Sequence, residues 1–91
     1  MARLSDADIS AGMAELSGWR RNGDSIVRDY RFPDFAGALE FVNRVAAVAE
    51  RANHHPDIDI RYNNVRLVLT SHDSGGITER DLRMAKAISA I

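Results

Sequence analysis

The sequence predicts an α+β fold: a four-stranded antiparallel sheet with three helices packed on one face. Two pairs of short stretches alternate apolar and polar residues around a turn, which is typical of β-hairpins. Three other stretches place apolar residues at helical spacing. The order is helix, hairpin, helix, hairpin, helix, which favours hairpin strands sharing one sheet. With 91 residues, the chain forms one domain, residues 1–91.

The first helix is expected to start after Ser5 and to end at Gly18. Ser5 can cap it, and Asp8 three places later completes a capping box. One apolar stripe follows, formed by Ile9, Met13 and Leu16.

The first hairpin is expected to join residues 19–22 to residues 25–32 through a Gly23-Asp24 turn. Pro33 stops the returning strand, because proline cannot donate to a ladder of hydrogen bonds. The more apolar face of that strand carries Ile26, Arg28, Tyr30 and Phe32.

The longest helix is expected from Phe35 to about Arg51, with Asp34 as its cap. Phe41 and Val48 add apolar surface beside the main stripe, so the helix is expected to bury a second side. That second side indicates either a subunit contact or burial under the first helix. The main stripe consists of Phe35, Leu39, Val42, Val45, Ala46 and Ala49.

The second hairpin is expected to join residues 58–62 to residues 65–70 through an Asn63-Asn64 turn with positive φ. Residues 71–76 are rich in Ser, Asp and Gly and are expected to form a loop that bends at its two glycines. Thr78 and Asp81 form the capping box of the last helix, whose inner stripe is Leu82, Ala85 and Ile88.

Composition excludes several classes of function. The formal net charge is −1, so there is no basic excess to contact nucleic acid directly. The absence of cysteine excludes disulfides and thiolate sites. The longest apolar run is too short to cross a membrane, and the N-terminus lacks the apolar core of a signal peptide. A soluble cytoplasmic protein is expected.

The only three histidines are His54, His55 and His72. The second hairpin lies between them and runs out and back, so its two ends are expected side by side. The three imidazoles would then face one small volume. An imidazole has an ordinary pKa of about 6.5 and can give or take a proton at neutral pH.

Spacing alone leaves three interpretations of this cluster open. The histidines can transfer protons, acting as acid and base on opposite sides of a bound molecule. They can bind zinc with Asp73, although the adjacent His54 and His55 point apart on an extended chain and do not easily share one ion. They can also be surface or helix-capping residues without chemistry.

Several spaced motifs resemble the signature of the pterin-4a-carbinolamine dehydratases. The resemblance extends upstream to Gly18-Trp19 and to the first hairpin, so it covers nearly the whole chain. Ser71 stands where a threonine is frequent in the family, and Asp57 where a glutamate is frequent. The motifs are residues 50–56 (ERANHHP), 62–65 (YNNV), 70–73 (TSHD), 76–78 (GIT) and Asp81.

The resemblance implies an α+β fold and a hydro-lyase that dehydrates 4a-hydroxytetrahydrobiopterin to the quinonoid dihydropterin. This reaction recycles the pterin cofactor of aromatic amino-acid hydroxylases. The resemblance further implies that the enzyme needs no metal or organic cofactor and that it forms homodimers or homotetramers.

The family's functional positions map onto this chain. Our hypothesis is that His54 and His72 transfer protons while His55 holds and orients the pterin. Glu50 would orient a neighbouring imidazole by its charge, whereas the capping box already accounts for Asp81. The implied catalytic set is His54, His55, His72, Glu50 and Asp81, and the implied substrate-binding set is Asn53, His54, His55, Thr70, Ser71, His72 and Asp73.

Two other functions stay open. Some members of the family double as a dimerisation cofactor of a homeodomain transcription factor, and the apolar second side of residues 35–51 would serve a non-catalytic module of that kind. A dehydratase-like protein acting on another pterin, such as one of molybdenum-cofactor metabolism, is the other alternative.

Overall fold

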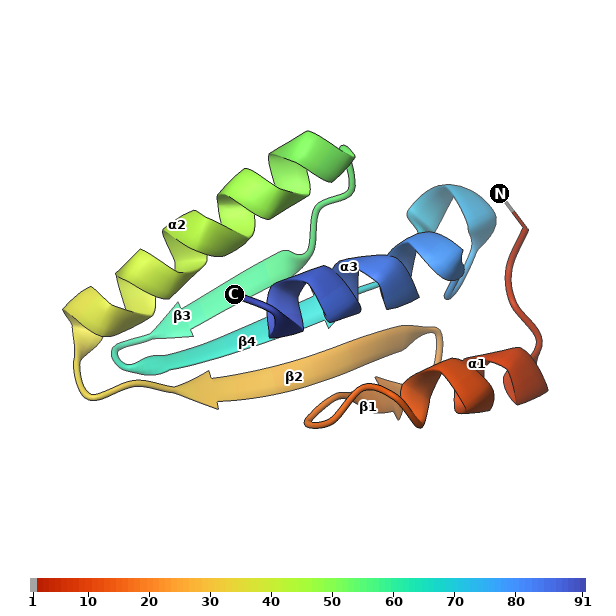
Figure 1. Ribbon diagram of the computed structural model, residues 1–91, viewed down its shortest axis with the longest axis horizontal. Coiled ribbons are helices and arrows are strands. Elements are labelled where there is room, and N and C mark those ends of the chain that lie inside the picture. The colour runs from red at the N-terminus through yellow and green to blue at the C-terminus, as the bar shows by residue number, and fades with distance from the viewer. Residues whose placement is uncertain (1) are drawn as a thin grey trace.

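The computed structural model describes residues 2–91, which form one four-stranded antiparallel sheet and three α-helices (Figure 1). All three helices lie on the same side of the sheet, as the sequence predicts. The elements are α1 (Asp6–Met13), β1 (Arg20–Asn22), β2 (Ser25–Arg31), α2 (Phe35–Ala52), β3 (Asp57–Arg61), β4 (Asn64–Leu69), the 3₁₀ turn η1 (His72–Ser74) and α3 (Glu79–Ser89).

The strands are arranged in the order β1-β2-β4-β3, so β4 lies between the two hairpins and links them. Ile26 lies opposite Leu69, and Tyr30 lies opposite Val65. Because directly opposed residues point to the same face, these rows form the apolar side of the sheet. The core between this side and the helices includes Ile9, Trp19, Ile26, Ala38, Val45, Val65, Leu67, Leu69, Ile77, Met84, Ala85 and Ile88.

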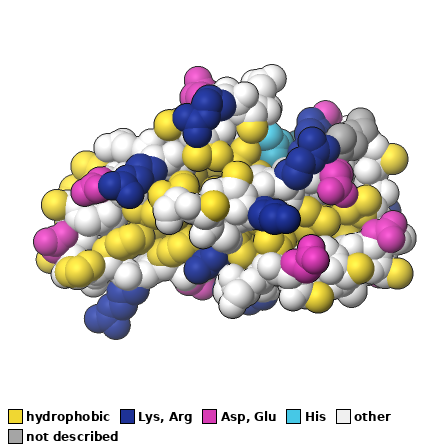
Figure 2. Space-filling model, viewed as in Figure 1, with side chains coloured by type: hydrophobic (Ala, Val, Ile, Leu, Met, Phe, Trp, Pro, Cys, Tyr) yellow, Lys and Arg dark blue, Asp and Glu magenta, His cyan; other side chains and the backbone are white. Residues whose placement is uncertain are grey.

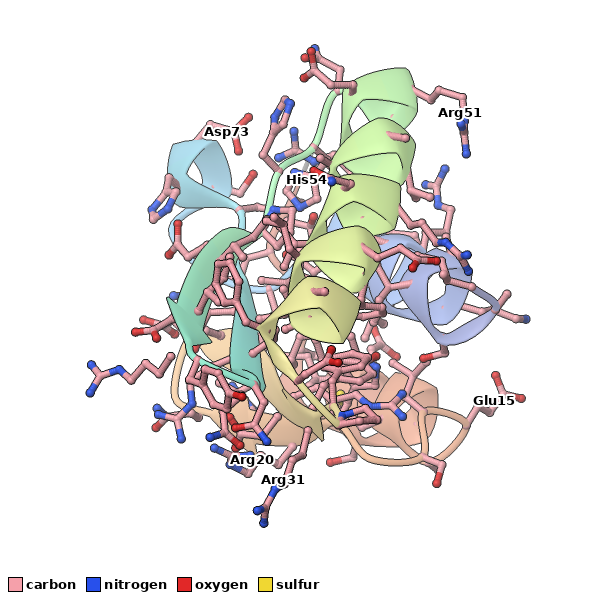
Figure 3. The ribbon with its side chains drawn as sticks, turned by 90° about the vertical axis from the view of Figure 1, so that its left-hand side faces the viewer. Glu15, Arg20, Arg31, Arg51, His54 and Asp73 are labelled. Carbon is pink, nitrogen blue, oxygen red and sulfur yellow. The ribbon has the colours of Figure 1, made fainter. Side chains whose placement is uncertain are left out.

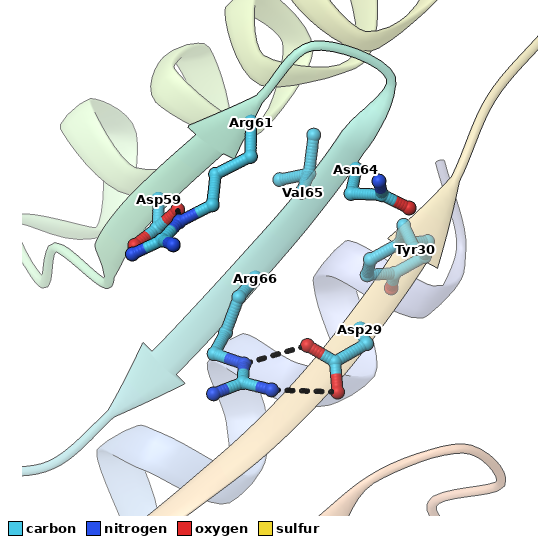
Figure 4. A pocket seen from close by; sticks show the side chains of 7 residues that line it. All are labelled: Asp29, Tyr30, Asp59, Arg61, Asn64, Val65 and Arg66. Atoms are coloured by element: carbon cyan, nitrogen blue, oxygen red, sulfur yellow. Dashed lines mark hydrogen bonds and ion pairs between the residues drawn. The ribbon is translucent and has the colours of Figure 1, made fainter.

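The opposite side of the sheet carries charged residues from three strands (Figure 4). Arg66 on β4 donates to Asp29 on β2 at 2.7 Å, and Arg20 on β1 donates to the same carboxylate at 3.0 Å. The hydrogen bond from Arg66 is the main reason why the pKa of Asp29 lies below its ordinary value. A shallow hollow of about 410 Å³ lies here, partly lined by Asp59 and Arg61 on β3.

The helix-covered side also exposes apolar side chains among its charged ones (Figure 2). Phe35 and Leu39 in the first turns of α2 are 46% and 40% exposed, although both lie on the predicted inner stripe. Val45 and Ala49, further along the stripe, are buried. Among residues 2–91, no helix has the length and apolar character that crossing a bilayer requires.

The first helix is shorter than predicted, because α1 ends at Met13 and not at Gly18. Ser5 caps it through a 3.2 Å bond from the backbone N–H of Asp8. Beyond Met13 the chain continues in tighter turns, in which the N–H of Leu16 bonds to Met13 and that of Trp19 bonds to Leu16. Leu16 and Trp19, which follow these turns, are both buried in the core.

The second hairpin turns one residue earlier than predicted. Tyr62 has the positive φ of 52°, and Asn64 is already the first residue of β4. Asn63 sets this register: its carbonyl accepts from the N–H of Phe32 at 2.9 Å, and its side-chain amide donates to the carbonyl of Phe32 at 2.9 Å. The predicted strands therefore exist, but contacts with the end of β2 fix the turn.

The loop after β4 is more ordered than a flexible bend. It contains η1 and is closed by a bridge between Ser71 and Gly76. A side chain at Gly76 would meet Cδ of Arg3, so this glycine permits a close approach of the N-terminal segment. Arg3 also donates to the carbonyl of Gly75 at 3.2 Å. The loop is therefore held at a fixed place beside the start of α3.

Candidate active site

His54 is positioned by the way α2 ends. Asn53 adopts the left-handed conformation (φ 49°, ψ 41°), and the N–H of His54 bonds back to the carbonyl of Ala49 at 3.2 Å. A left-handed residue after the last helical residue reverses the chain direction. Because the chain reverses here, the side chain of His54 lies near α3 rather than in solvent. Asn53 itself is exposed.

The ring of His54 contacts a buried carboxylate. Its Nε2 lies 2.6 Å from Oδ1 of Asp81, a residue 27 positions away on α3. The side chain of Asp81 is fully buried and that of His54 is only 11% exposed. Burying an ionised group costs free energy unless the group is paired and hydrogen-bonded. The contact with His54 therefore helps to offset the cost of burying the Asp81 side chain.

Two further groups satisfy the Asp81 carboxylate. Its Oδ2 accepts from the backbone N–H of Thr78 at 2.9 Å, which completes the predicted capping box of α3. The same oxygen accepts from the hydroxyl of Ser71 at 2.8 Å. Asp81 therefore ties together the segment after α2, the end of β4 and the start of α3. The sequence predicts the capping box but gives no signal for the contact with His54.

His55 has a different environment, although it is the next residue. Its Nε2 forms a short contact with Oε2 of Glu50, one turn back on α2. This pair lies at the surface, where the side chains are 52% and 76% exposed. The prediction that Glu50 orients an imidazole therefore has a geometric basis, and the imidazole concerned is that of His55.

His72 lies on η1 and is exposed. Its neighbour Asp73 accepts from Nη2 of Arg80 at 2.5 Å. This hydrogen bond is the main reason why the pKa of Asp73 lies below its ordinary value. The contact fastens η1 to the first turn of α3. Asp73 and His54 lie at the same end of the molecule, beside the C-terminal end of α2 (Figure 3).

Two separate hollows adjoin the histidines. His54 lines a groove of about 290 Å³ between α2 and α3, with Val48, Ala52, Arg80, Arg83, Met84 and Ala87. His72 lines a more open hollow of about 450 Å³, with Asn22, Asp24, Ser25, Thr70, Gly75 and Gly76. These hollows have no lining residue in common, whereas we expected the three imidazoles to face one volume. The chain brings the histidine segments together through Asp81 and Ser71 rather than around one cavity.

The predicted substrate-binding residues of the β4 end differ in what their side chains can reach. The hydroxyl of Thr70 donates to the carbonyl of Asp24 at 2.7 Å and lies beside the hollow of His72. Ser71 is only 1% exposed, and its hydroxyl donates to the Asp81 carboxylate.

Arg80 was not predicted as a site residue, although it lines the groove of His54 and forms an ion pair with Asp73, the residue after His72. Its place in the first turn of a capped helix is the only signal the sequence offers.

The described part of the chain, residues 2–91, contains no group of three or more histidine, aspartate or glutamate side chains arranged to hold a metal ion. The arrangement instead offers imidazoles that are each next to a carboxylate or at the surface. Such groups can donate and accept protons. The site is therefore suited to acid–base chemistry.

Comparisons with known proteins identify the family of this chain. The sequence model of the family described as pterin 4 alpha carbinolamine dehydratase matches residues 2–91. A relative from Thermomicrobium roseum is 55% identical over 91 residues, covering 100% of this chain and 98% of its own. A relative from Thermosynechococcus vestitus is 51% identical over 87 residues, covering 96% and 92%. Both carry the provisional name pterin-4-alpha-carbinolamine dehydratase.

Solved structures have the same fold. A transcriptional coactivator/pterin dehydratase from Brucella melitensis superposes with a TM-score of 0.92 at 33% identity, covering 97% of this chain and 96% of that one. A pterin dehydratase-like protein, a RuBisCO assembly factor of the alpha-carboxysome, gives a TM-score of 0.68 at 24% identity, covering 80% and 87%. The second likeness concerns the fold alone. On the family match and these identities, the chain belongs to the pterin 4 alpha carbinolamine dehydratase family.

Proposed function

We propose that this protein is a hydro-lyase that removes water from a 4a-hydroxytetrahydropterin by histidine acid–base catalysis. The observation that carries the proposal is the His54–Asp81 contact, in which a nearly buried imidazole meets a fully buried carboxylate beside a groove. Family membership supports the substrate class. The biological role would be to recycle the pterin cofactor of aromatic amino-acid hydroxylases.

The reaction needs two proton movements. One proton leaves N5 of the substrate, and its bonding electrons form the C4a=N5 double bond. The C4a–O bond breaks, and the leaving hydroxyl takes a proton and departs as water. Histidine suits both movements because imidazole and imidazolium are both populated near neutral pH.

We assign the proton transfers to His54 and His72 and the orientation of the pterin to His55. Glu50 supports this role of His55 through its contact, and Asp81 supports His54. Asn53, Thr70 and Asp73 are the other candidate contacts of the pterin. The separate hollows of His54 and His72 make the assignment sharply testable, because one ligand must reach both rings.

The test is stopped-flow dehydration of a synthetic pterin carbinolamine by the wild-type protein and by His54→Ala and His72→Ala. We expect each variant to lose about 100-fold or more in kcat, the usual contribution of an acid–base group, with a smaller change in KM. Wild-type turnover in one variant would leave a single histidine at the reaction centre. No acceleration by the wild-type protein would reject the enzymatic proposal.

Exposed apolar residues favour a second copy of the chain as a partner. Phe35 and Leu39 are the exposed large apolar residues of α2, and their burial in a homodimer or homotetramer would stabilise the assembly. Leu39→Glu is expected to lower the oligomeric state measured by light scattering. An unchanged molar mass would contradict this contact.

A non-catalytic dimerisation module would use the second side of α2, at Phe41 and Val48, or this exposed surface at Phe35 and Leu39. The Brucella melitensis protein is described as both coactivator and dehydratase, and this description supports the second candidate function. The stopped-flow assay separates the two, because an interaction module would not accelerate water loss. Competition between carbinolamine and other pterins tests whether a different pterin is the substrate. A cytoplasmic location stays a prediction from the sequence.

A further inference from the structure

We infer that His54 exchanges its proton through Nδ1, and that Ser71 is a positioning residue acting through Asp81. This inference rests on the proposed function for its catalytic consequence. Which ring nitrogen of His54 carries the hydrogen can be tested without measuring catalytic turnover. It gives the buried Ser71 hydroxyl a role behind the site, and leaves open only a backbone contact between Ser71 and the substrate.

The donors around Asp81 favour its carboxylate form. The backbone N–H of Thr78 can only donate, and it points to Oδ2 at 2.9 Å. The hydroxyl of Ser71 donates to the same oxygen at 2.8 Å. Asp81 also occupies the third position of α3, where the helix dipole favours negative charge. All of these features stabilise the carboxylate form.

An ionised Oδ1 can only accept, so the hydrogen in its 2.6 Å contact with His54 belongs to Nε2. Nδ1 is then the ring nitrogen left for proton exchange. No hydrogen bond to Nδ1 is found among residues 2–91. The buried side-chain atoms without a partner in this part of the chain are the Tyr30 hydroxyl and Nε of Arg80, so Nδ1 is not sealed in the core.

The proton balance of the catalytic step follows from this geometry. As a base, Nδ1 accepts the proton from N5 of the substrate and the ring becomes an imidazolium. As an acid, the imidazolium returns a proton from Nδ1 to the leaving hydroxyl. In both directions Nε2 keeps its hydrogen and Asp81 stays ionised, so the carboxylate stabilises the cationic ring without taking its proton.

Ser71 acts on the His54 ring indirectly, through Asp81. Its hydroxyl lies 2.8 Å from both Asp81 and the Thr78 hydroxyl, in a site from which solvent is excluded. Because the side chain is 1% exposed, a substrate cannot contact this hydroxyl. Its bond instead holds the carboxylate at the angle from which Oδ1 meets His54. A threonine would keep that bond, whereas alanine would remove it.

The first experiment reads the tautomer in the wild-type protein. A long-range ¹H–¹⁵N correlation spectrum of protein with ¹⁵N-labelled histidine is recorded at about pH 8.5, about two units above the ordinary imidazole pKa. The His54 signals are assigned by their loss in His54→Gln. We expect a protonated Nε2 and an unprotonated Nδ1. A neutral ring with its hydrogen on Nδ1 would overturn the inference, whether or not the protein turns over.

The second experiment compares Ser71→Ala, Ser71→Thr and the control Ser89→Ala. Ser89 is also a hydrogen-bonded serine, but its partners Trp19, Arg28 and Ala85 lie outside the site. We expect Ser71→Ala to lower kcat about 10-fold, as for the loss of one hydrogen bond to a charged group, with KM retained. Ser71→Thr should retain kcat, and Ser89→Ala should lower stability alone.

Equal kcat in Ser71→Ala and wild type would overturn the positioning role, and so would a rise in KM without a fall in kcat. If Ser71→Ala does not fold, the wild-type spectrum and Ser71→Thr still decide the inference. If the wild-type protein dehydrates no carbinolamine, the proposed function fails. The inference about the tautomer of His54 is then decided by the NMR spectrum alone.

Discussion

His54 and His55 are neighbours in sequence, and each contacts a carboxylate, but the two pairs lie in opposite environments. His54 and Asp81 are 11% and 0% exposed, whereas His55 and Glu50 are 52% and 76% exposed. The partner of His54 comes from a different helix, and the partner of His55 lies one turn back on α2. The same two chemical groups therefore form one tertiary pair and one local pair.

The difference teaches that burial, not the kind of contact, decides what a carboxylate does for an imidazole. An exposed pair is weakened by water and mobile ions and contributes little to stability. A buried pair is costly to break, because the remaining partner stays unpaired away from water. We therefore expect Asp81 to matter for folding and turnover, and Glu50 to matter mainly for how His55 meets the substrate.

The largest expected effect is that of Asp81→Ala. This change removes the acceptor of three groups, those of His54, Ser71 and Thr78, from a fully buried site. We expect the free energy of unfolding to fall by about 3–5 kcal/mol, measured by urea denaturation followed through Trp19 fluorescence. A loss below about 1 kcal/mol would show that water replaces the carboxylate easily, and the contrast with the exposed pair would disappear.

A smaller effect is expected from Glu50→Gln. The amide keeps the size of the side chain but removes its charge, so the contact with His55 weakens at the surface. We expect the free energy of unfolding to change by less than about 0.5 kcal/mol, KM to rise by no more than about fivefold and kcat to stay near wild type. A fall in kcat comparable to that of His54→Ala would instead place this pair at the proton-transfer step.

The smallest expected effect concerns the exposed Asp73–Arg80 pair, which extends the comparison to η1. Arg80 holds the pKa of Asp73 below its ordinary value in the folded protein. The pair therefore contributes stability above the unfolded pKa of about 3.9, and this contribution is lost as the pH falls through the lower folded value. Arg80→Met is expected to raise the pKa of Asp73, measured by NMR titration of its side-chain carboxyl carbon.

Arg83→Met is the matched control for this titration. Arg83 lies on the same helix and lines the same groove, but it forms no ion pair with Asp73. The pKa of Asp73 should stay where it is in that variant. An equal rise in both variants would mean that the net charge of α3, rather than the contact with Arg80, lowers the pKa.

Most of the fold follows from local patterns, and the exceptions have identifiable causes. Alternation in residues 25–32 and 65–70 predicts both central strands, which the structure has at 25–31 and 64–69, because side chains on a strand point to opposite faces in turn. The capping box at Thr78 predicts the start of α3. The end of α1 and the turn at Tyr62 were predicted wrongly, since tighter turns replace the helix after Met13 and contacts of Asn63 with Phe32 fix the hairpin turn.

The amino-acid sequence by itself determined the elements, the apolar face of the sheet, the family signature and the placement of three histidines around one hairpin. The tertiary structure alone decided that His54, and not His55, meets Asp81, and that His72 lines a different hollow. The physical reason is range: spacing and caps act over a few residues, whereas a buried polar contact exists only after α3 has packed beside the end of α2.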